Sequence, residues 1–227
     1  MLKIFIGFDH RQPVSYNVLQ QSIFTRSSKP VAITPLVLPQ LPITRVGLTP
    51  FTYTRFLVPW LCNYEGWALF LDLDMLLRDD ISKLFDFKDD KYSVMVIKNQ
   101  KRFEWASVML FNCSKCEILT PQYIQEASNL HVLSWSKEEE IGELPSHWNH
   151  LVGYDPERKD ASLIHYTQGV PCFEETYGCE YSDEWEFERK VLTYAKPWVE
   201  LMGNSVHSTM ENGKIIPKLK AKKIIMG

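Results

Sequence analysis

The stretch Trp67-Ala-Leu-Phe-Leu-Asp-Leu-Asp-Met-Leu-Leu77 sets two aspartates inside an otherwise apolar run. A run of this kind predicts a buried β-strand, in which alternate side chains share a face. Asp72 and Asp74 are therefore expected on one face, with Leu73 on the other. Two adjacent carboxylates in apolar surroundings repel each other and lose hydration, so they need a cation between them. Carboxylates suit Mg²⁺ or Mn²⁺. An arginine or the backbone of a neighbouring loop is the structural alternative.

Outward from this stretch, the chain alternates apolar runs with segments of helical spacing. Strands are expected at 2–8, 31–38, 92–97 and 106–111, and helices at 13–24, 51–64 and 120–128. The alternation predicts an α/β fold, with a sheet covered by helices on both faces. Ligands of such sheets gather at the carboxyl ends of the strands, where Asp9 and the aspartate pair fall.

Composition narrows the classes of function. The 227 residues carry 25 Lys and Arg against 28 Asp and Glu, a net charge of −3, and 45% of them are hydrophobic. This is a globular composition without the basic excess that nucleic-acid binding requires. The five cysteines are odd in number, and Cys113-x-x-Cys116 lacks the second half of a zinc site. Reduced thiols and a cytoplasmic location are therefore expected.

Four segments, in order, resemble GT-A-fold glycosyltransferases of family 8, the group of glycogenin and the bacterial lipopolysaccharide galactosyltransferases. Residues 4–9 resemble the first strand and the turn that holds the nucleotide base. Residues 53–56 resemble the helix whose arginine faces the donor, and residues 70–74 match the metal motif. Residues 164–171 resemble the late segment whose histidine is the third metal ligand.

The resemblance implies a GT-A mixed sheet flanked by helices and a metal site of Asp72, Asp74 and His165. A nitrogen ligand beside two carboxylates favours Mn²⁺ over Mg²⁺. The donor contacts that the resemblance implies lie at strand ends and turns: Gly7, Phe8, Asp9, Arg55, Leu73 and Gly169. The family has a diphosphate-binding lysine near the position of Val170, so the diphosphate is expected to rely on the metal, Arg55 and backbone N–H groups around Gly169.

Further motifs are similar to compact bacterial and viral members of the group. They are Trp105-Ala-Ser107, Asn112, Glu139-Glu-Ile-Gly-Glu-Leu-Pro145 and Trp148-Asn149. This similarity implies substrate contacts by Trp105, Ser107, Trp148 and Asn149, and catalytic roles for Glu139, Glu140 and Arg55. One of the two glutamates is expected to face the donor sugar, while Glu138 faces water.

Each candidate also has a structural interpretation. Asp9 can cap the helix that begins near Pro13. Arg55 can be a surface arginine of an amphipathic helix, and His165 a hydrogen-bonded strand residue. Trp105 and Trp148 can be core aromatics.

The predicted activity is transfer of a sugar from a UDP-sugar, or another nucleoside-diphosphate sugar, to a hydroxyl acceptor on a glycan. Family 8 enzymes retain the anomeric configuration, and an inverting reaction needs a carboxylate base, for which Glu139 or Glu140 is available. A phosphohydrolase of the haloacid dehalogenase type, with Asp72 as nucleophile, is one alternative. Leu76 stands where that class has Thr or Val, and the motif follows the third strand instead of the first. A catalytically silent nucleotide-sugar binder is the other alternative.

Residues 1–213 are predicted to form a single GT-A domain, followed by a basic tail or linker at 214–227. Five lysines lie between Lys214 and Lys223. Each lysine near an anionic surface contributes about 1 kcal/mol, so the tail is a candidate for weak peripheral membrane contact. A plain solvated terminus is the alternative.

Overall fold

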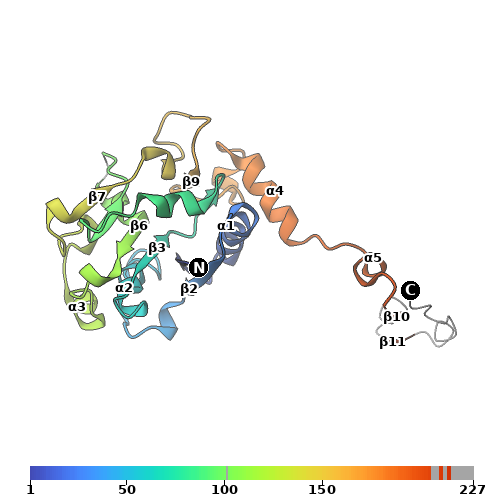
Figure 1. Cartoon of the computed structure of the whole chain (residues 1–227). Helices are drawn as coiled ribbons and strands as arrows, with labels where there is room; N and C mark the ends of the chain where they lie inside the picture. The colour runs from blue at the N-terminus through green and yellow to red at the C-terminus, as the bar shows by residue number, and fades with distance from the viewer. Residues whose placement is uncertain (101, 206–209, 212–213, 216–227) are drawn as a thin grey trace. The chain divides into compact units, whose positions relative to one another are not determined.

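The computed structural model describes residues 1–100, 102–205, 210–211 and 214–215. By its internal contacts the chain divides into two compact units, Met1–Leu192 and Thr193–Gly227. The first unit holds most of the strands and helices of the chain (Figure 1). The division falls before the predicted domain boundary at residue 213.

A six-stranded mixed sheet forms the centre of the first unit. Its strands, in spatial order, are β2 (Val31–Leu36), β1 (Leu2–Gly7), β3 (Trp67–Leu71), β6 (Val108–Asn112), β5 (Val94–Val96) and β7 (Ile141–Glu143). Neighbouring strands are parallel, except that β6 runs antiparallel to both β3 and β5. The predicted strands at 2–8, 31–38, 92–97 and 106–111 are confirmed, with ends that differ by a few residues.

The register of this sheet determines which chain segments meet. Phe70 of β3 pairs with Phe5 of β1 and with Met109 of β6, and Met109 pairs with Val96 of β5. Val96 in turn pairs with Glu143 of β7. The carboxyl ends of β1, β3, β5 and β7 therefore lie along one edge, together with the amino end of β6.

The predicted single strand at 67–77 is wrong, because the chain bends between Leu71 and Met75. After β3 the chain leaves the six-stranded sheet and continues as β4 (Met75–Leu77) in a second sheet, ordered β4, β9 (Leu163–His165) and β8 (His150–Leu151). The N–H of Asp72 donates to the carbonyl of Ser107 (3.0 Å), and the N–H of Tyr166 donates to the carbonyl of Asp74 (2.9 Å). Asp72 and Asp74 thus lie in the connection between two sheets instead of within one strand.

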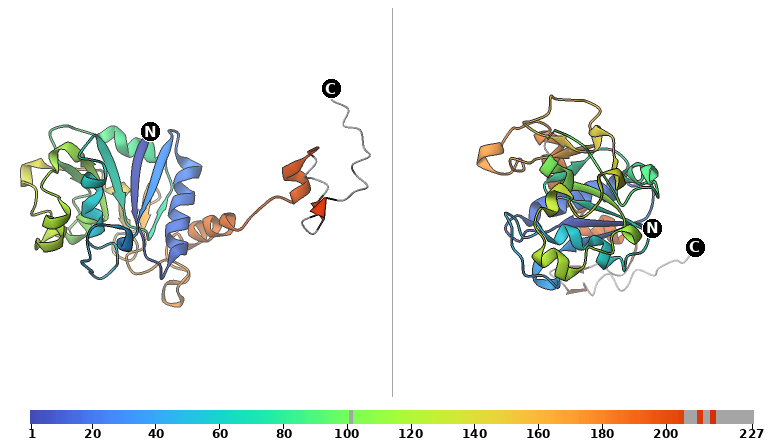
Figure 2. Two further views of the ribbon diagram at one scale, coloured as in Figure 1. Left: turned by 90° about the horizontal axis from the view of Figure 1, so that it is seen from below. Right: turned by 90° about the vertical axis from the view of Figure 1, so that its left-hand side faces the viewer.

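Helices cover the faces of these sheets (Figures 1 and 2). The α-helices of the first unit are α1 (Pro13–Arg26), α2 (Val58–Leu61), α3 (Pro121–Glu126) and α4 (Ser182–Leu192). Pro13 occupies the first turn of α1, where a missing N–H is harmless. Helix α1 packs against β4 and α4. The helix predicted at 51–64 is largely replaced by a 3-10 helix (η2, Thr54–Leu57) followed by the short α2, whose first turn contains Pro59.

Short 3-10 helices occupy many of the remaining connections. They are η1 (Leu38–Gln40), η3 (Ile81–Phe87), η4 (Arg102–Ser107), η5 (Cys113–Lys115), η6 (Leu130–Val132), η7 (Glu138–Glu140), η8 (Ser146–Trp148) and η9 (Glu174–Thr176).

Two apolar clusters hold the first unit together. The larger surrounds the six-stranded sheet, and a smaller one packs the second sheet against α1 and α4. Helix α1 contributes Leu19 to the first cluster and Val18 to the second, and both are fully buried. The predicted α/β architecture, a mixed sheet flanked by helices, is confirmed.

The second unit contains α5 (Trp198–Met202) and a pair of two-residue strands, β10 (Met210–Glu211) and β11 (Lys214–Ile215), which are antiparallel. Of the predicted basic tail at 214–227, all but Lys214 and Ile215 lie outside the described residues. Within the described part of the chain, every helix is too short or too polar to cross a membrane.

Candidate metal centre

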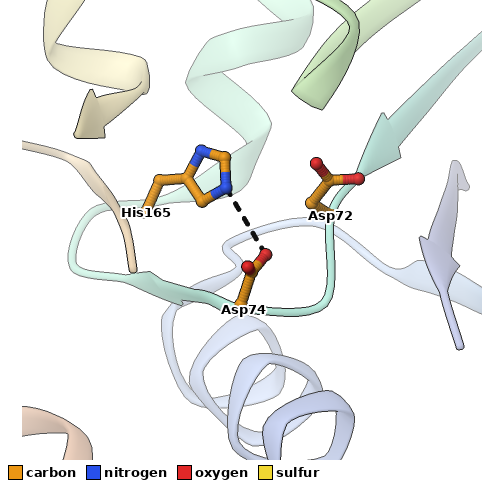
Figure 3. Close-up of side chains that lie close together, drawn as sticks. All are labelled: Asp72, Asp74 and His165. Carbon is orange, nitrogen blue, oxygen red and sulfur yellow. Dashed lines mark ion pairs between the residues drawn. The ribbon is translucent and has the colours of Figure 1, made fainter. Parts of the chain in front are cut away.

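Three potential ligands converge at the carboxyl edge of the six-stranded sheet. Asp72 and Asp74 lie in the bend between β3 and β4, and His165 is the last residue of β9. The pairing of β4 with β9 sets Met75 opposite His165, which brings the imidazole beside the bend. One ligand atom from each of the three residues lies within 4.8 Å of the other two (Figure 3).

The carboxylates of this cluster can accept further hydrogen bonds or bind a cation. Oδ1 of Asp72 and Oδ1 of Asp74 are both buried, and neither has a hydrogen bond of good geometry, although Nη2 of Arg55 lies 2.9 Å from Oδ1 of Asp72. Nε2 of His165 lies 3.4 Å from Oδ1 of Asp74. Buried carboxylate oxygens whose hydrogen bonding is incomplete are costly. Two such oxygens and an imidazole nitrogen around one point form a donor set that fits a divalent cation such as Mn²⁺.

Arg55 is the positive charge nearest to Asp72. Its Nη2 lies 2.9 Å from Oδ1 of Asp72, and its Nη1 donates to Oδ2 of Asp72 (3.4 Å) and to the carbonyl of Ala106 (2.7 Å). The structural alternative for the aspartate pair, an arginine partner, therefore holds for Asp72. Arg55 is buried, so it is not the surface arginine of the other interpretation.

Burial dominates the electrostatics of the cluster. It raises the pKa of Asp72 to about 7, although Arg55 opposes the shift and Asp74 reinforces it. Burial by itself lowers the pKa of His165, but the carboxylate of Asp74 raises it above its ordinary value. The cluster therefore takes up positive charge readily, as protons or as a cation.

Two of the residues predicted to bind substrate support His165 instead. Oδ1 of Asn149 lies 3.0 Å from Nδ1 of His165, and Nδ2 of Asn149 donates to Oγ of Ser107 (2.9 Å). Both Asn149 and Ser107 are buried, with 1% exposure each. Their side chains are thus used within the protein.

The two predicted tryptophans fit the core interpretation. Trp148 is 1% exposed, and Trp105 is 9% exposed. The indole N–H of Trp105 donates to the carbonyl of Asn99 (2.9 Å), and the guanidinium of Arg102 covers its ring at 4.7 Å.

The predicted nucleotide turn after β1 is internally bonded. The carboxylate of Asp9 accepts from the backbone N–H and the guanidinium of Arg11, and this pairing lowers the pKa of Asp9. Asp9 does not cap α1, whose N-cap residue is Gln12. Phe8 packs edge-on against Tyr16. A Cβ at Gly7 would lie 2.5 Å from the Phe51 ring, so glycine is needed there for close packing.

The turn after His165 also has a special glycine. Gly169 has φ of +122°, a conformation that residues with a Cβ rarely adopt. Its N–H donates to the carbonyl of Tyr166 (2.8 Å), so the predicted phosphate-binding N–H of Gly169 is already bonded within the turn. Leu73, between the two aspartates, is fully buried.

The structure does not bring Glu139 or Glu140 to the cluster. Both precede β7, whereas Asp72 follows β3, and β7 and β3 run in the same direction. Because Glu143 is level with Phe70, Glu140 lies about 16 Å from Asp72 along the strand direction. Glu139 is exposed, and Glu140 pairs with Lys137 (3.4 Å).

Three polar groups near the cluster were not predicted from the sequence. Glu104, in η4, is close enough to Asp72 and His165 to influence the pKa of both. Buried side-chain atoms without a hydrogen-bond partner belong to Asn99, just after β5, and to Thr167, just after β9. Asn99 and Thr167 each follow a predicted strand, where ligands of such sheets gather, and this position could have identified them as site residues.

A separate cavity of about 320 Å³ lies beyond the far end of β4. Its lining includes Arg26 and Arg78, which pair with Glu188 (2.6 Å) and Glu184 (2.8 Å). These charges are already compensated, so the cavity offers no comparable ligand set.

Comparison with known proteins gives one sequence relative and a group of similar folds. No protein-family model matches the chain. The chain is 36% identical over 220 residues to Protein CDI of Arabidopsis thaliana, an alignment that covers 81% of this chain and 84% of the relative.

Similar solved structures are glycosyltransferases. The bifunctional glycosyltransferase WbbM matches with a TM-score of 0.67 and 16% identity over 88% of this chain, which spans 50% of the WbbM chain. The galactosyltransferase LgtC, solved with donor and acceptor sugar analogs, matches with a TM-score of 0.60 and 14% identity over 88% of this chain and 99% of its own. GlyE of Streptococcus pneumoniae matches with a TM-score of 0.64 and 16% identity over 83% of this chain and 61% of its own. The fold is therefore that of GT-A glycosyltransferases.

Proposed function

The chain belongs to the family of Protein CDI of Arabidopsis thaliana, and because it has a GT-A fold we propose that it is a metal-dependent glycosyltransferase. The proposed reaction moves a sugar from a UDP-sugar, or another nucleoside-diphosphate sugar, to a hydroxyl acceptor on a glycan. We assign it to the family 8 group on the four motif segments. The similarity to compact bacterial and viral members stays a prediction.

The observation that carries the proposal is the cluster of Asp72, Asp74 and His165. It lies at the carboxyl edge of the sheet, where ligands of open α/β sheets bind. It contains two buried carboxylate oxygens, one from each aspartate, that lack a hydrogen bond of good geometry. A divalent cation held there, Mn²⁺ in this proposal, would offset the charge that develops on the leaving diphosphate.

The chain's own residues hold this arrangement in place. Arg55 keeps the buried Asp72 carboxylate compensated and links it to the end of η4 through the carbonyl of Ala106. The side chain of Asp74 is 24% exposed, whereas that of His165 is 3% exposed. Solvent and donor therefore reach the cluster from the Asp74 side.

The position of the two glutamates supports retention of configuration. An inverting reaction needs a carboxylate base beside the acceptor hydroxyl. Glu139 and Glu140, the candidates for that role, lie towards the edge of the sheet opposite to Asp72. We therefore propose a retaining transfer.

The alternatives make different predictions. The fold does not favour the phosphohydrolase, and the carboxylate it would use as a nucleophile, Asp72, is engaged by Arg55. A silent nucleotide-sugar binder would share the fold and the metal but leave the donor intact. The single domain at 1–213 stays a prediction from the sequence. So does the weak membrane contact of the lysines at 214–223.

The experiment is a thermal-shift screen of nucleoside diphosphates and their sugars, with and without Mn²⁺, followed by detection of released nucleotide. The matched variant is Asp74→Asn, which keeps the shape of the side chain and removes its charge. Stabilisation by UDP that needs both Mn²⁺ and Asp74, together with slow donor cleavage, would support the proposal. Metal-independent stabilisation would contradict the metal role, and an intact donor would favour the silent binder.

A further inference from the structure

A chain of hydrogen bonds leads from a backbone carbonyl to the imidazole of His165. The hydroxyl of Ser107 lies 2.6 Å from the carbonyl oxygen of Glu104. The same Oγ lies 2.9 Å from Nδ2 of Asn149, and Oδ1 of Asn149 lies 3.0 Å from Nδ1 of His165. The side chains of Ser107, Asn149 and His165 are all buried, so water does not offer easy substitutes for these partners.

The direction of every hydrogen bond in this series follows from the first acceptor, the carbonyl of Glu104. A carbonyl oxygen can only accept, so the single hydroxyl proton of Ser107 points to Glu104. Oγ of Ser107 must then accept from Asn149, which requires the NH₂ group of the amide on that side. The carbonyl end of the amide therefore faces His165 and accepts from Nδ1.

The opposite amide orientation leaves the contact with Ser107 unsatisfied and restricts the contact with His165. Oδ1 of Asn149 would then face the oxygen of Ser107, whose proton is already used. The NH₂ group would face Nδ1 of His165 and could bond only if that nitrogen carried a lone pair. The observed orientation satisfies all three partners, and buried polar groups are nearly always satisfied.

From this geometry we propose that Asn149 is a positioning residue that fixes His165 as the Nδ1–H tautomer. Nε2, the nitrogen that faces Asp74 in Figure 3, then carries the lone pair that a metal ion requires. Histidines that bind metals commonly donate their other ring N–H to such an acceptor. The inference rests on the proposed metal-dependent function and assigns Asn149 a role other than substrate contact.

Ser107 ties this support to the other half of the cluster. Its carbonyl oxygen accepts the N–H of Asp72 (3.0 Å), while its hydroxyl holds Asn149. One residue, immediately before β6, therefore sets both the bend that carries the aspartates and the orientation of the imidazole. The cluster is organised before any ligand binds, which reduces the reorganisation that binding requires.

The test measures the tautomer directly, in the metal-free protein without nucleotide. The ¹⁵N NMR shifts of the two ring nitrogens distinguish a protonated from an unprotonated nitrogen. They are recorded at a pH high enough to leave the imidazole neutral, and the signals of His165 are identified by their loss in His165→Gln. We expect Nδ1–H and an unprotonated Nε2 in the wild-type protein.

Three variants separate positioning from folding. Asn149→Leu removes the acceptor, and we expect the proton to move to Nε2, where Asp74 can accept it. Asn149→Asp restores an acceptor and should keep Nδ1–H. Ser107→Ala frees the amide orientation and should give a mixture of the two tautomers. Thermal unfolding shows whether each variant is folded, and Ser107→Ala provides the test if Asn149→Leu is not.

Binding of Mn²⁺ alone, followed by electron paramagnetic resonance, gives the second measurement. Asn149→Leu should lose about 10- to 100-fold in Mn²⁺ affinity, while Asn149→Asp should stay close to wild type. An Nε2–H tautomer in the wild-type protein would overturn the inference, as would unchanged tautomers in both Asn149→Leu and Ser107→Ala. A wild-type protein with Nδ1–H that binds no Mn²⁺ would instead contradict the proposed function, because the tautomer is measured without metal.

Discussion

Replacing Arg55 by methionine should destabilise the protein through Asp72. The guanidinium lies 2.9 Å from Oδ1 of Asp72, and the two side chains are 8% and 11% exposed. Removing one partner of a buried ion pair costs about 3–5 kcal/mol, because the remaining charge is left uncompensated. Methionine keeps much of the length of the side chain, so the loss of packing is small by comparison.

The size of the effect should depend on pH, because Asp72 can avoid the penalty by binding a proton. Its pKa is already raised to about 7 by burial, and without Arg55 it rises further. A folded pKa above the unfolded value means that the folded state binds more protons, so stability falls as the pH rises. In the wild-type protein the free energy of unfolding stops falling near pH 7, where Asp72 is ionised, whereas in the variant it continues to fall. The difference in stability between the two proteins should therefore grow by about 1.4 kcal/mol per pH unit above pH 7.

Thermal unfolding at about pH 6 and about pH 8 measures this difference. We expect a loss near the lower end of the range at pH 8, about 3 kcal/mol, and about half of that at pH 6. For a chain of this size, 3 kcal/mol corresponds to about 6–12 °C in Tm. Added Mn²⁺ should stabilise the variant more than the wild-type protein, since a cation at the cluster replaces the lost charge.

Arg189→Met is the matched control. Arg189 pairs with Glu186 at 2.6 Å, but its side chain is 46% exposed, so its removal should cost less than about 1 kcal/mol. A loss in the Arg55 variant that equals the control, or that is the same at both pH values, would show that Arg55 does not compensate a buried Asp72 charge.

Three further predictions concern other parts of the first unit. Burial lowers the pKa of His131 to about 4 from an ordinary value of 6.5, so stability should fall by up to about 3 kcal/mol as the pH falls from 6.5 to 4. Acid unfolding of His131→Gln should lack that component, and an unchanged pH profile would count against it. Glu139→Gln and Glu140→Gln should each transfer sugar at the wild-type rate, because both lie away from the cluster, and a strongly reduced rate in either would contradict that placement. Gly7→Ala should lose about 1–3 kcal/mol in urea unfolding because its Cβ would meet the Phe51 ring, and wild-type stability would show that the ring yields freely.

The sequence predicts most strands of the sheet, because each is a short apolar run bounded by polar or turn residues. It does not predict the bend at 72–74, since the residues on both sides of the bend are equally apolar. The pattern of apolar residues indicates only which residues are buried. Strands β3 and β4 are both buried, so the pattern does not show that they belong to different sheets. The aspartates still converge, because the pairing of β4 with β9 brings His165 beside them.

The position of the acidic segment could not be predicted from order along the chain. Strand β7 follows β6 in sequence but pairs with β5, in the parallel direction. Its preceding residues, Glu139 and Glu140, consequently lie towards the edge opposite to Asp72. Local patterns do not encode which strands become neighbours, because that depends on long-range packing.

The roles of Arg55 and Asn149 likewise depend on tertiary contacts. The sequence marks both residues as candidates, but it does not show that Arg55 reaches Asp72 or that Asn149 reaches His165. Such partners become visible only when the ends of β3, β6 and β9 are placed at one edge.

We propose that Asp72, Asp74 and His165 hold a divalent metal for nucleotide-sugar transfer. The decisive test is a crystal grown with Mn²⁺ and UDP, with anomalous diffraction recorded at the manganese absorption edge. We expect one anomalous peak coordinated by both carboxylates, Nε2 of His165 and the diphosphate, and no peak there in Asp74→Asn. A nucleotide bound with no anomalous peak at these three residues, or with manganese held elsewhere, would contradict it.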